Sequence, residues 1–187
     1  MKRSIILIAI FLASCNYVIY TPPERLKTIV NYKHIDSNNF ENTWQTLVNN
    51  LLANFFQIDH LDKNSGFIQI TLSTNDYAEY IEAGTIKEPT FDENDEISDV
   101  TKYISRYANP DLTMRVNVIL QNENNRLKLT VNAKYIYTVT TRNEYQFIKP
   151  TANFTTNSFD YIITLRGTKV IIQPTHKLEQ DILEIVK

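Results

Sequence analysis

Residues 112–139 read LTMRVNVILQNENNRLKLTVNAKYIYTV, and this stretch decides the fold. Apolar residues occupy every second position on both sides of a polar run, residues 122–125, whose composition favours a turn. Clean alternation with one polar face is typical of an antiparallel sheet that is covered on one side only. The pattern therefore predicts two long paired strands, the first after Pro110 and the second from Leu127 to Thr140.

Upstream of these strands the apolar spacing changes from two to three and four, which indicates a helix with one buried face. We expect Asn38 to be its N-cap, with Glu41 as the capping-box partner. A hairpin follows, with arms 56–60 and 67–73 and a turn at 62–66. Residues 76–84 predict a short helical turn closed by Gly84, or an extended segment. The acidic stretch 87–98 predicts an exposed loop. The residues on the apolar face of the helix are Phe40, Trp44, Leu47, Val48, Leu51, Leu52 and Phe55.

Downstream, residues 159–165 and 168–172 predict two shorter strands. The chain ends in a helix for which Thr175, directly after Pro174, is a good N-cap. Its apolar face carries Leu178, Ile182, Ile185 and Val186. The predicted fold class is α+β, an antiparallel sheet with an N-terminal amphipathic helix and a C-terminal helix packed on one face. A single domain, residues 37–187, holds all of it.

The first 14 residues have the composition of an export signal. Lys2 and Arg3 form a positive tip, residues 4–11 are almost wholly apolar, and small residues follow. The apolar run is shorter than the ~20 residues that a membrane-spanning helix needs. Residues 15–36, which contain Pro22 and Pro23, predict a stiffened tether, part of which packs on the domain through its apolar residues.

The four residues Leu12, Ala13, Ser14 and Cys15 resemble the lipobox of bacterial lipoproteins. The resemblance implies a signal peptide of residues 1–14, cleavage by signal peptidase II before Cys15, diacylglycerol on the Cys15 sulfur and a fatty acid such as palmitate on its amino group. Two or three acyl chains hold a protein firmly at a bilayer, whereas one binds only marginally. Asn16 stands where Asp retains lipoproteins of enteric bacteria at the inner membrane, so the resemblance implies the periplasmic face of the outer membrane.

The mature part is similar to the helix-grip domains of some envelope lipoproteins, including BamC of the outer-membrane barrel-assembly machine. The similarity comes from the Trp44-bearing helix before a hairpin, from residues 80–84 after that hairpin, and from residues 174–179 before the last helix. In such proteins cysteines often stand near the places that Ala83 and Ile172 occupy here. The resemblance implies a non-enzymatic envelope protein and carries over no catalytic residue.

Composition narrows the possible functions further. Removal of the leader leaves 17 basic and 21 acidic residues, a net charge of −4, which offers no electrostatic footprint for nucleic acid. Cys15 is the sole cysteine, so no intrachain disulfide forms. With three glycines, all far apart, the chain lacks the loops that cradle phosphates. No cofactor is expected.

The sequence contains few candidates for a chemical site. His34, His60 and His176 have no second His or Cys at ligand spacing and predict surface or edge positions. Asp92, Asn94 and Glu96 alternate as in a calcium loop, but Ile97 and Tyr103 stand where an EF-hand needs Gly and Glu, so a solvated acidic loop is the better interpretation. No metal site is predicted. The cationic residues Arg115, Lys128 and Lys134 fit an ordinary charged outer face better than a surface for lipid headgroups or lipopolysaccharide.

The sequence leaves three functional hypotheses open. The leading hypothesis is a membrane-anchored scaffold or accessory subunit that binds an envelope protein partner in outer-membrane or secretion assembly. The alternative is a module that binds a lipid or a small apolar ligand between helix and sheet, which a core filled by Trp44, Phe55, Met114 and Tyr137 would exclude. The third is a hydrolase that uses carboxylates from among Asp76, Glu79 and Asp160.

Overall fold

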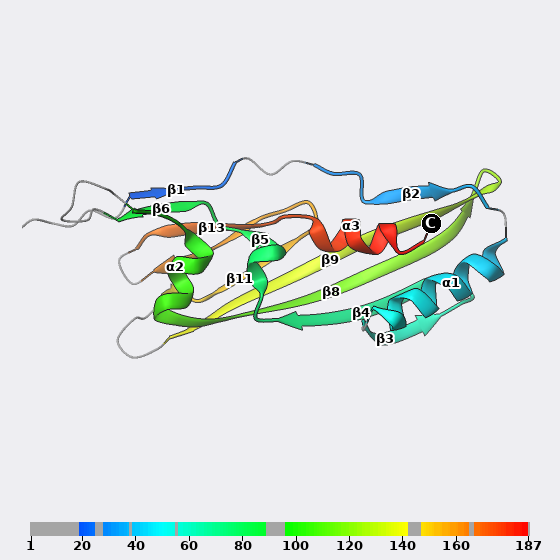
Figure 1. The fold of residues 1–187 in the computed structure, drawn as a ribbon, viewed down its shortest axis with the longest axis horizontal. Helices are drawn as coiled ribbons and strands as arrows, with labels where there is room; N and C mark the ends of the chain where they lie inside the picture. Colours follow the sequence, from blue (N-terminus) through cyan, green and yellow to red (C-terminus); the bar gives the residue numbers. More distant parts are fainter. Residues whose placement is uncertain are drawn as a thin grey trace, which may run out of the picture.

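The computed structural model describes residues 19–24, 28–37, 39–54, 56–88, 96–141, 147–164 and 167–186. Figure 1 shows an elongated body in which strands predominate. Its elements in chain order are β1 (Ile19–Thr21), β2 (Tyr32–Ile35), α1 (Phe40–Ala53), β3 (Gln57–Asp62), β4 (Phe67–Thr74), the 3₁₀ turn η1 (Tyr77–Glu79), β5 (Ile81–Glu82), β6 (Thr85–Glu88), β7 (Glu96–Asp99), α2 (Val100–Tyr107), β8 (Ala108–Glu123), β9 (Arg126–Thr141), β10 (Phe147–Lys149), β11 (Thr151–Thr155), β12 (Asp160–Thr164), β13 (Lys169–Pro174) and α3 (Lys177–Glu184).

Strands β8 and β9 form the long hairpin that the alternation predicts. They pair in unbroken register from Ala108–Thr141 to Glu123–Arg126. Asn124 and Asn125 connect them with positive φ angles of 50° and 64°, the conformation of the two-residue hairpin turns that Asn favours. β8 begins earlier than predicted and includes Pro110. The missing N–H of Pro110 breaks no bond to β4, because β4 ends its pairing opposite Leu112.

The largest sheet has six antiparallel strands in the order β11-β9-β8-β4-β3, with β2 also paired to β9. β2 pairs with residues 127–130 of β9 and β11 pairs with residues 134–138, so the two short strands follow one another along the same edge. The hairpin β3–β4, with its turn at residues 63–66, confirms the prediction for that segment. Together with three helices, this architecture confirms the α+β class.

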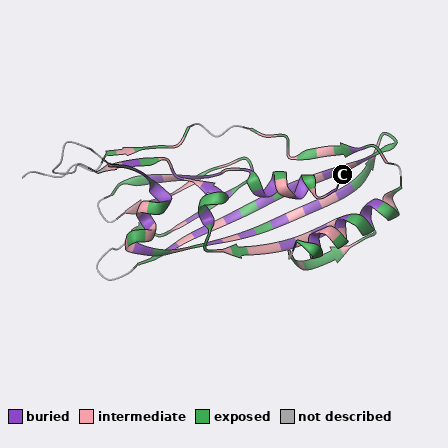
Figure 2. Cartoon of the chain, in the orientation of Figure 1, coloured by how far each residue is buried: buried purple, intermediate pink, exposed green. Residues whose placement is uncertain are grey.

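One face of this sheet carries the core. Trp44, Leu47 and Leu51 of α1 and Leu178 and Ile182 of α3 lie in the same buried cluster as the inward-facing residues of β8 and β9. Each fully buried side chain of this kind contributes about 1.5–3 kcal/mol of hydrophobic stabilisation. Figure 2 shows the resulting alternation of buried and exposed positions along the two strands. The inward-facing residues are Leu112, Met114, Val116, Val118, Leu120, Leu127, Leu129, Val131, Ala133, Tyr135, Tyr137 and Val139.

Two smaller sheets, β10-β12-β13-β5 and β1-β6-β7, extend the core toward one end of the body (Figure 1). Ile162, Val170 and Ile172 of the first are buried, which confirms the two predicted downstream strands. Helix α2 was not predicted. The side chain of Asp99 accepts a hydrogen bond from the backbone N–H of Thr101 at 2.7 Å and caps the helix.

The structure corrects several details of the first and last helices. Asn39, not Asn38, is the N-cap of α1, and its side chain accepts a hydrogen bond from the Asn42 N–H at 3.0 Å. Asn38 and Phe55 lie outside the described residues. Leu52, expected on the apolar face, is 55% exposed, because the buried face centres on Leu47 and Leu51 and leaves Leu52 on its flank.

At α3 the predicted N-cap, Thr175, is wrong by one residue. His176 takes that position with a left-handed φ of 68°. Thr175 instead continues the strand contacts, since its backbone N–H donates to the Tyr80 carbonyl and its hydroxyl donates to the Glu79 carbonyl. The predicted acidic loop, residues 87–98, is also shorter than expected. β6 extends to Glu88 and β7 begins at Glu96, while residues 89–95 lie outside the described residues.

Candidate functional site

The predicted anchor at Cys15, together with residues 1–18 as a whole, lies outside the described residues. Among the residues that the structure describes, no helix is long and apolar enough to cross a membrane. The segment 15–36, predicted as a tether, contributes two strands to the folded body. β1 pairs with β6 and β2 pairs with β9, so the expectation that part of this segment packs on the domain is confirmed.

The chain passes very close to Gly84 where it leaves β1. An added Cβ at Gly84 would stand 2.2 Å from the Thr21 carbonyl oxygen and 2.7 Å from backbone atoms of Pro22 and Pro23. Its φ of +79° also belongs to the region that side-chain-bearing residues rarely adopt. On the other side, the Tyr20 hydroxyl accepts a hydrogen bond from the backbone N–H of Ile171 at 3.0 Å. β1 is therefore held between β6 and β13 by specific contacts.

Four buried polar side chains on β9, on α3 and at the α3 N-cap are short of hydrogen-bond partners or bind one another, and we call them the α3 polar cluster: Tyr135, Tyr137, His176 and Glu179. Glu179 is fully buried, and its Oε2 accepts a 2.7 Å hydrogen bond from the Tyr135 hydroxyl. Its second oxygen, Oε1, has no protein partner. A buried carboxylate with one hydrogen bond is costly to hold in a core, because its charge is removed from water.

The other members of the α3 polar cluster are also short of partners. His176 is 6% exposed and neither of its ring nitrogens forms a hydrogen bond. The Tyr137 hydroxyl is likewise unpaired, although its ring packs edge-on against Tyr77 with centroids 5.6 Å apart. His176 was predicted at the surface, and this is wrong because the left-handed turn before α3 directs the residue into the core. His34 and His60 are exposed, as expected.

Burial changes the acidity of the two phenols. Desolvation raises the pKa of Tyr135 far above its ordinary value, and the neighbouring Glu179 carboxylate adds to the increase. Desolvation raises the pKa of Tyr137 as well, with a smaller contribution from Tyr77. Both phenols therefore keep their protons at neutral pH, which leaves Tyr135 as a donor to Glu179.

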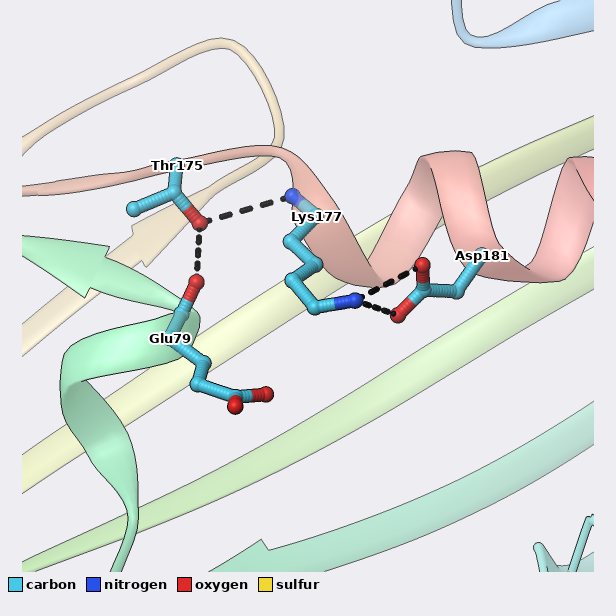
Figure 3. Close-up of polar contacts among 4 residues, drawn as sticks. All are labelled: Glu79, Thr175, Lys177 and Asp181. Atoms are coloured by element: carbon cyan, nitrogen blue, oxygen red, sulfur yellow. Dashed lines mark hydrogen bonds and ion pairs between the residues drawn. The ribbon is translucent and has the colours of Figure 1, made fainter.

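The N-terminal end of α3 is joined to η1 by exposed polar contacts (Figure 3). The Thr175 hydroxyl donates to the Glu79 carbonyl at 2.6 Å and accepts from the Lys177 N–H at 3.4 Å. The Lys177 ammonium contacts both carboxylate oxygens of Asp181 at 2.7 and 2.9 Å, and this contact raises the Lys177 pKa. The ion pair is exposed to solvent, so its contribution to stability is small.

The three carboxylates proposed for hydrolysis differ in their surroundings. Asp76 is the N-cap of η1 and Glu79 is its last residue, and both are exposed. Asp160 accepts hydrogen bonds from Lys149 Nζ at 2.6 Å and from the Asn153 N–H at 2.8 Å. Partial burial raises the Asp160 pKa, but these hydrogen bonds outweigh it and hold the pKa below its ordinary value.

The cationic residues of the sheet lie on its open face. Arg115 and Lys134 are directly opposite one another in the β8–β9 register, and both are exposed. Lys128 is paired with Glu123 at 3.0 Å and lies 4.6 Å from the ring centroid of Tyr32. Two like charges opposite each other weaken a strand pair. The Arg115–Lys134 pair is therefore unfavourable, and replacement of one of the two cations would remove the repulsion.

Within the described residues, no group of three or more His, Cys, Asp or Glu side chains is arranged to hold a metal ion. The calcium-loop residues Asp92 and Asn94 lie outside those residues, and Glu96 belongs to β7. Of the four residues proposed to fill the space between helix and sheet, Trp44, Met114 and Tyr137 are buried in one continuous core. The burial of Glu179 was not anticipated, and its position next to Leu178 on an amphipathic helix was the available signal.

Comparison of the chain with family models, curated proteins and solved structures finds no match.

Proposed function

We propose that this chain is a lipoprotein of the bacterial envelope, attached to the outer membrane through acyl chains on Cys15 and serving as a non-enzymatic scaffold or accessory subunit. The observation that carries the proposal is the leader, in which a positive tip, an apolar stretch and the residues Leu12, Ala13, Ser14 and Cys15 follow in order. The chain contains no other cysteine, so acylation of Cys15 uses its single thiol.

The folded body is compatible with this role. Its core is continuous over the six-stranded sheet and the helices, so the residues of this core are buried by the fold itself. The net charge of −4 for the mature chain favours repulsion from an anionic bilayer. A covalent lipid is then the natural means of attachment, because neither a spanning helix within the described residues nor overall charge supplies one.

Fractionation of cells that produce the full chain tests the anchor. We expect the unaltered protein in the membrane fraction and a Cys15→Ser variant in the soluble or unprocessed form. Ser14→Ala is the matched control, because it keeps a small residue before the cleavage point and leaves the acceptor thiol in place. An unaltered protein that is found in the soluble fraction, or that keeps residues 1–14, would contradict the anchor.

Crosslinking in intact cells tests the scaffold role. We expect recovery of a specific envelope protein with the unaltered chain and loss of that partner when Cys15→Ser removes the domain from the membrane. Recovery of no partner would count against a scaffold while leaving the anchor itself supported by fractionation. An Asn16→Asp variant addresses the choice of membrane, and we expect it to shift toward the inner membrane.

A further inference from the structure

The position of β1 connects the proposed anchor to the shape of the domain. Three residues lie between Cys15 and Ile19, the first residue of β1, and the four residue-to-residue steps of a fully extended chain span at most about 14 Å. β1 is not loose: its three residues pair with Lys87, Ile86 and Thr85 of β6. The anchor therefore cannot lie more than about 14 Å from the start of β1.

β1 lies at one end of the body, together with β6 and α2 (Figure 1). Contacts along the chain agree with the picture. The chain leaving β1 packs against Gly84, the Gly84 carbonyl accepts a hydrogen bond from the Val100 N–H at 3.1 Å, and Val100 begins α2. β8 starts at Ala108, immediately after α2. The anchor, α2 and the start of β8 thus belong to the same end.

The opposite end holds α1 and the β8–β9 turn (Figure 1). Phe40 of α1 stacks on Trp44 with ring centroids 5.9 Å apart. It also lies 3.6 Å from the position of a Cβ at Gly66, whose carbonyl accepts a hydrogen bond from the Leu120 N–H. The twelve residue-to-residue steps from Ala108 to Leu120 correspond to about 40 Å of strand. Trp44 is therefore separated from the anchored end by about 40 Å along β8.

We infer that the lipidated domain stands with its β1–β6–β7 end toward the bilayer and holds α1 and the β8–β9 turn away from it. This orientation rests on the proposed lipid anchor. It follows from a tether that is short relative to the long axis of the body, and the net negative charge of the mature chain opposes a flat arrangement on anionic lipid.

Trp44 is the single tryptophan of the chain, which makes the orientation measurable. The lipidated protein is reconstituted in vesicles of phosphatidylcholine and phosphatidylglycerol with a dansyl-labelled lipid, and energy transfer from tryptophan to dansyl is recorded. The comparison variants carry Trp44→Phe together with Ile19→Trp, or Trp44→Phe together with Lys102→Trp in α2. Ile19 and Lys102 are exposed, so both sites accept a larger side chain.

We expect the unaltered protein to lose several-fold less tryptophan emission than either variant. A lipidated protein in which Trp44 transfers as strongly as the two proximal tryptophans contradicts the orientation while leaving the proposed function intact. Mass spectrometry of the purified protein precedes the measurement. Absence of lipid on Cys15 contradicts the proposed function, and the orientation with it, so the two failures are distinguishable.

Discussion

The hydroxyl of Tyr135 donates a 2.7 Å hydrogen bond to Glu179 Oε2, and both residues are fully buried. This bond joins β9, one of the two longest strands of the sheet, to α3. Two residues further along β9, Tyr137 presents an equally buried hydroxyl that has no partner. The two tyrosines thus form a matched pair that differs in a single hydrogen bond.

Removal of the two hydroxyls is expected to have opposite effects on the free energy of unfolding. Tyr135→Phe removes the one partner of a buried carboxylate and should destabilise the domain by about 1.5–3 kcal/mol. Tyr137→Phe removes an unsatisfied polar group and should be neutral or stabilising by up to about 1 kcal/mol. Urea unfolding followed by Trp44 fluorescence provides both values. A loss of stability that is equal in the two variants would show that the Tyr135–Glu179 bond contributes nothing.

Glu179→Gln tests the same contact from the helix side. Glutamine keeps an acceptor oxygen for Tyr135 and removes the charge that burial makes costly, so we expect this variant to be at least as stable as the unaltered protein. Glu179→Ala leaves the Tyr135 hydroxyl unpaired and opens space in the core, and should cost about 2–4 kcal/mol. Greater destabilisation by Gln than by Ala would rule out this account of the cluster.

Alkaline pH should unfold the domain. The folded-state pKa values of Tyr135 and Tyr137 lie above the unfolded value of 10.0, so their contribution to stability is complete below pH 10 and is lost as the pH rises above it. Each phenol then costs about 1.4 kcal/mol for every pH unit above 10. The double variant Tyr135→Phe/Tyr137→Phe should show a shallower decline than the unaltered protein between pH 10 and 12, as measured by urea midpoints at each pH. Parallel declines would show that other groups control alkaline unfolding.

Gly84→Ala should weaken the docking of β1. The new methyl group meets backbone atoms of residues 21–23 and the positive φ adds about 1–2 kcal/mol of strain. Gly167→Ala is the control, because Gly167 has a similar φ of +80° but no atom within 4 Å of an added Cβ. We expect faster hydrogen exchange in β1 and β6 for Gly84→Ala only. The same exchange in both variants would show that the close approach of Pro22 and Pro23 has no structural effect.

Lys134→Glu should stabilise the β8–β9 pair. It replaces two opposed cations with an oppositely charged pair at Arg115, an effect worth about 0.2–1 kcal/mol in a cross-strand position. Lys134→Thr, which removes the repulsion without adding attraction, should give an intermediate thermal midpoint. A lower midpoint for the glutamate than for the threonine would contradict the cross-strand pairing of Arg115 with residue 134.

The sequence predicted best the elements whose pattern is local and long. β8 and β9 alternate over many residues, and α1 repeats its apolar spacing over four turns, so neither depends on knowledge of a partner. β1, β2, β10 and β11 have three to five residues each and are defined by the strands that they pair with, far away in the chain. For this reason the sequence alone does not distinguish these four strands from a tether or a connecting loop.

The α3 polar cluster was missed for a related cause. Charged residues are exposed more often than not, and histidine is intermediate between the buried and the exposed residue types. Glu179 and His176 are buried because tertiary packing brings the first turn of α3 onto Tyr135 and its neighbours. The predicted lipid anchor has the opposite character: its evidence is entirely local, in residues 1–15, and nothing in the folded body is needed to predict it.

Intact-mass and peptide mass spectrometry of the protein purified from its native host tests directly whether the Cys15 sulfur carries lipid. We expect a chain that begins at Cys15 and carries the mass of diacylglycerol on sulfur, with a further acyl chain on the amino group. A chain that still begins at Met1, or an unmodified Cys15 thiol, would contradict the central claim.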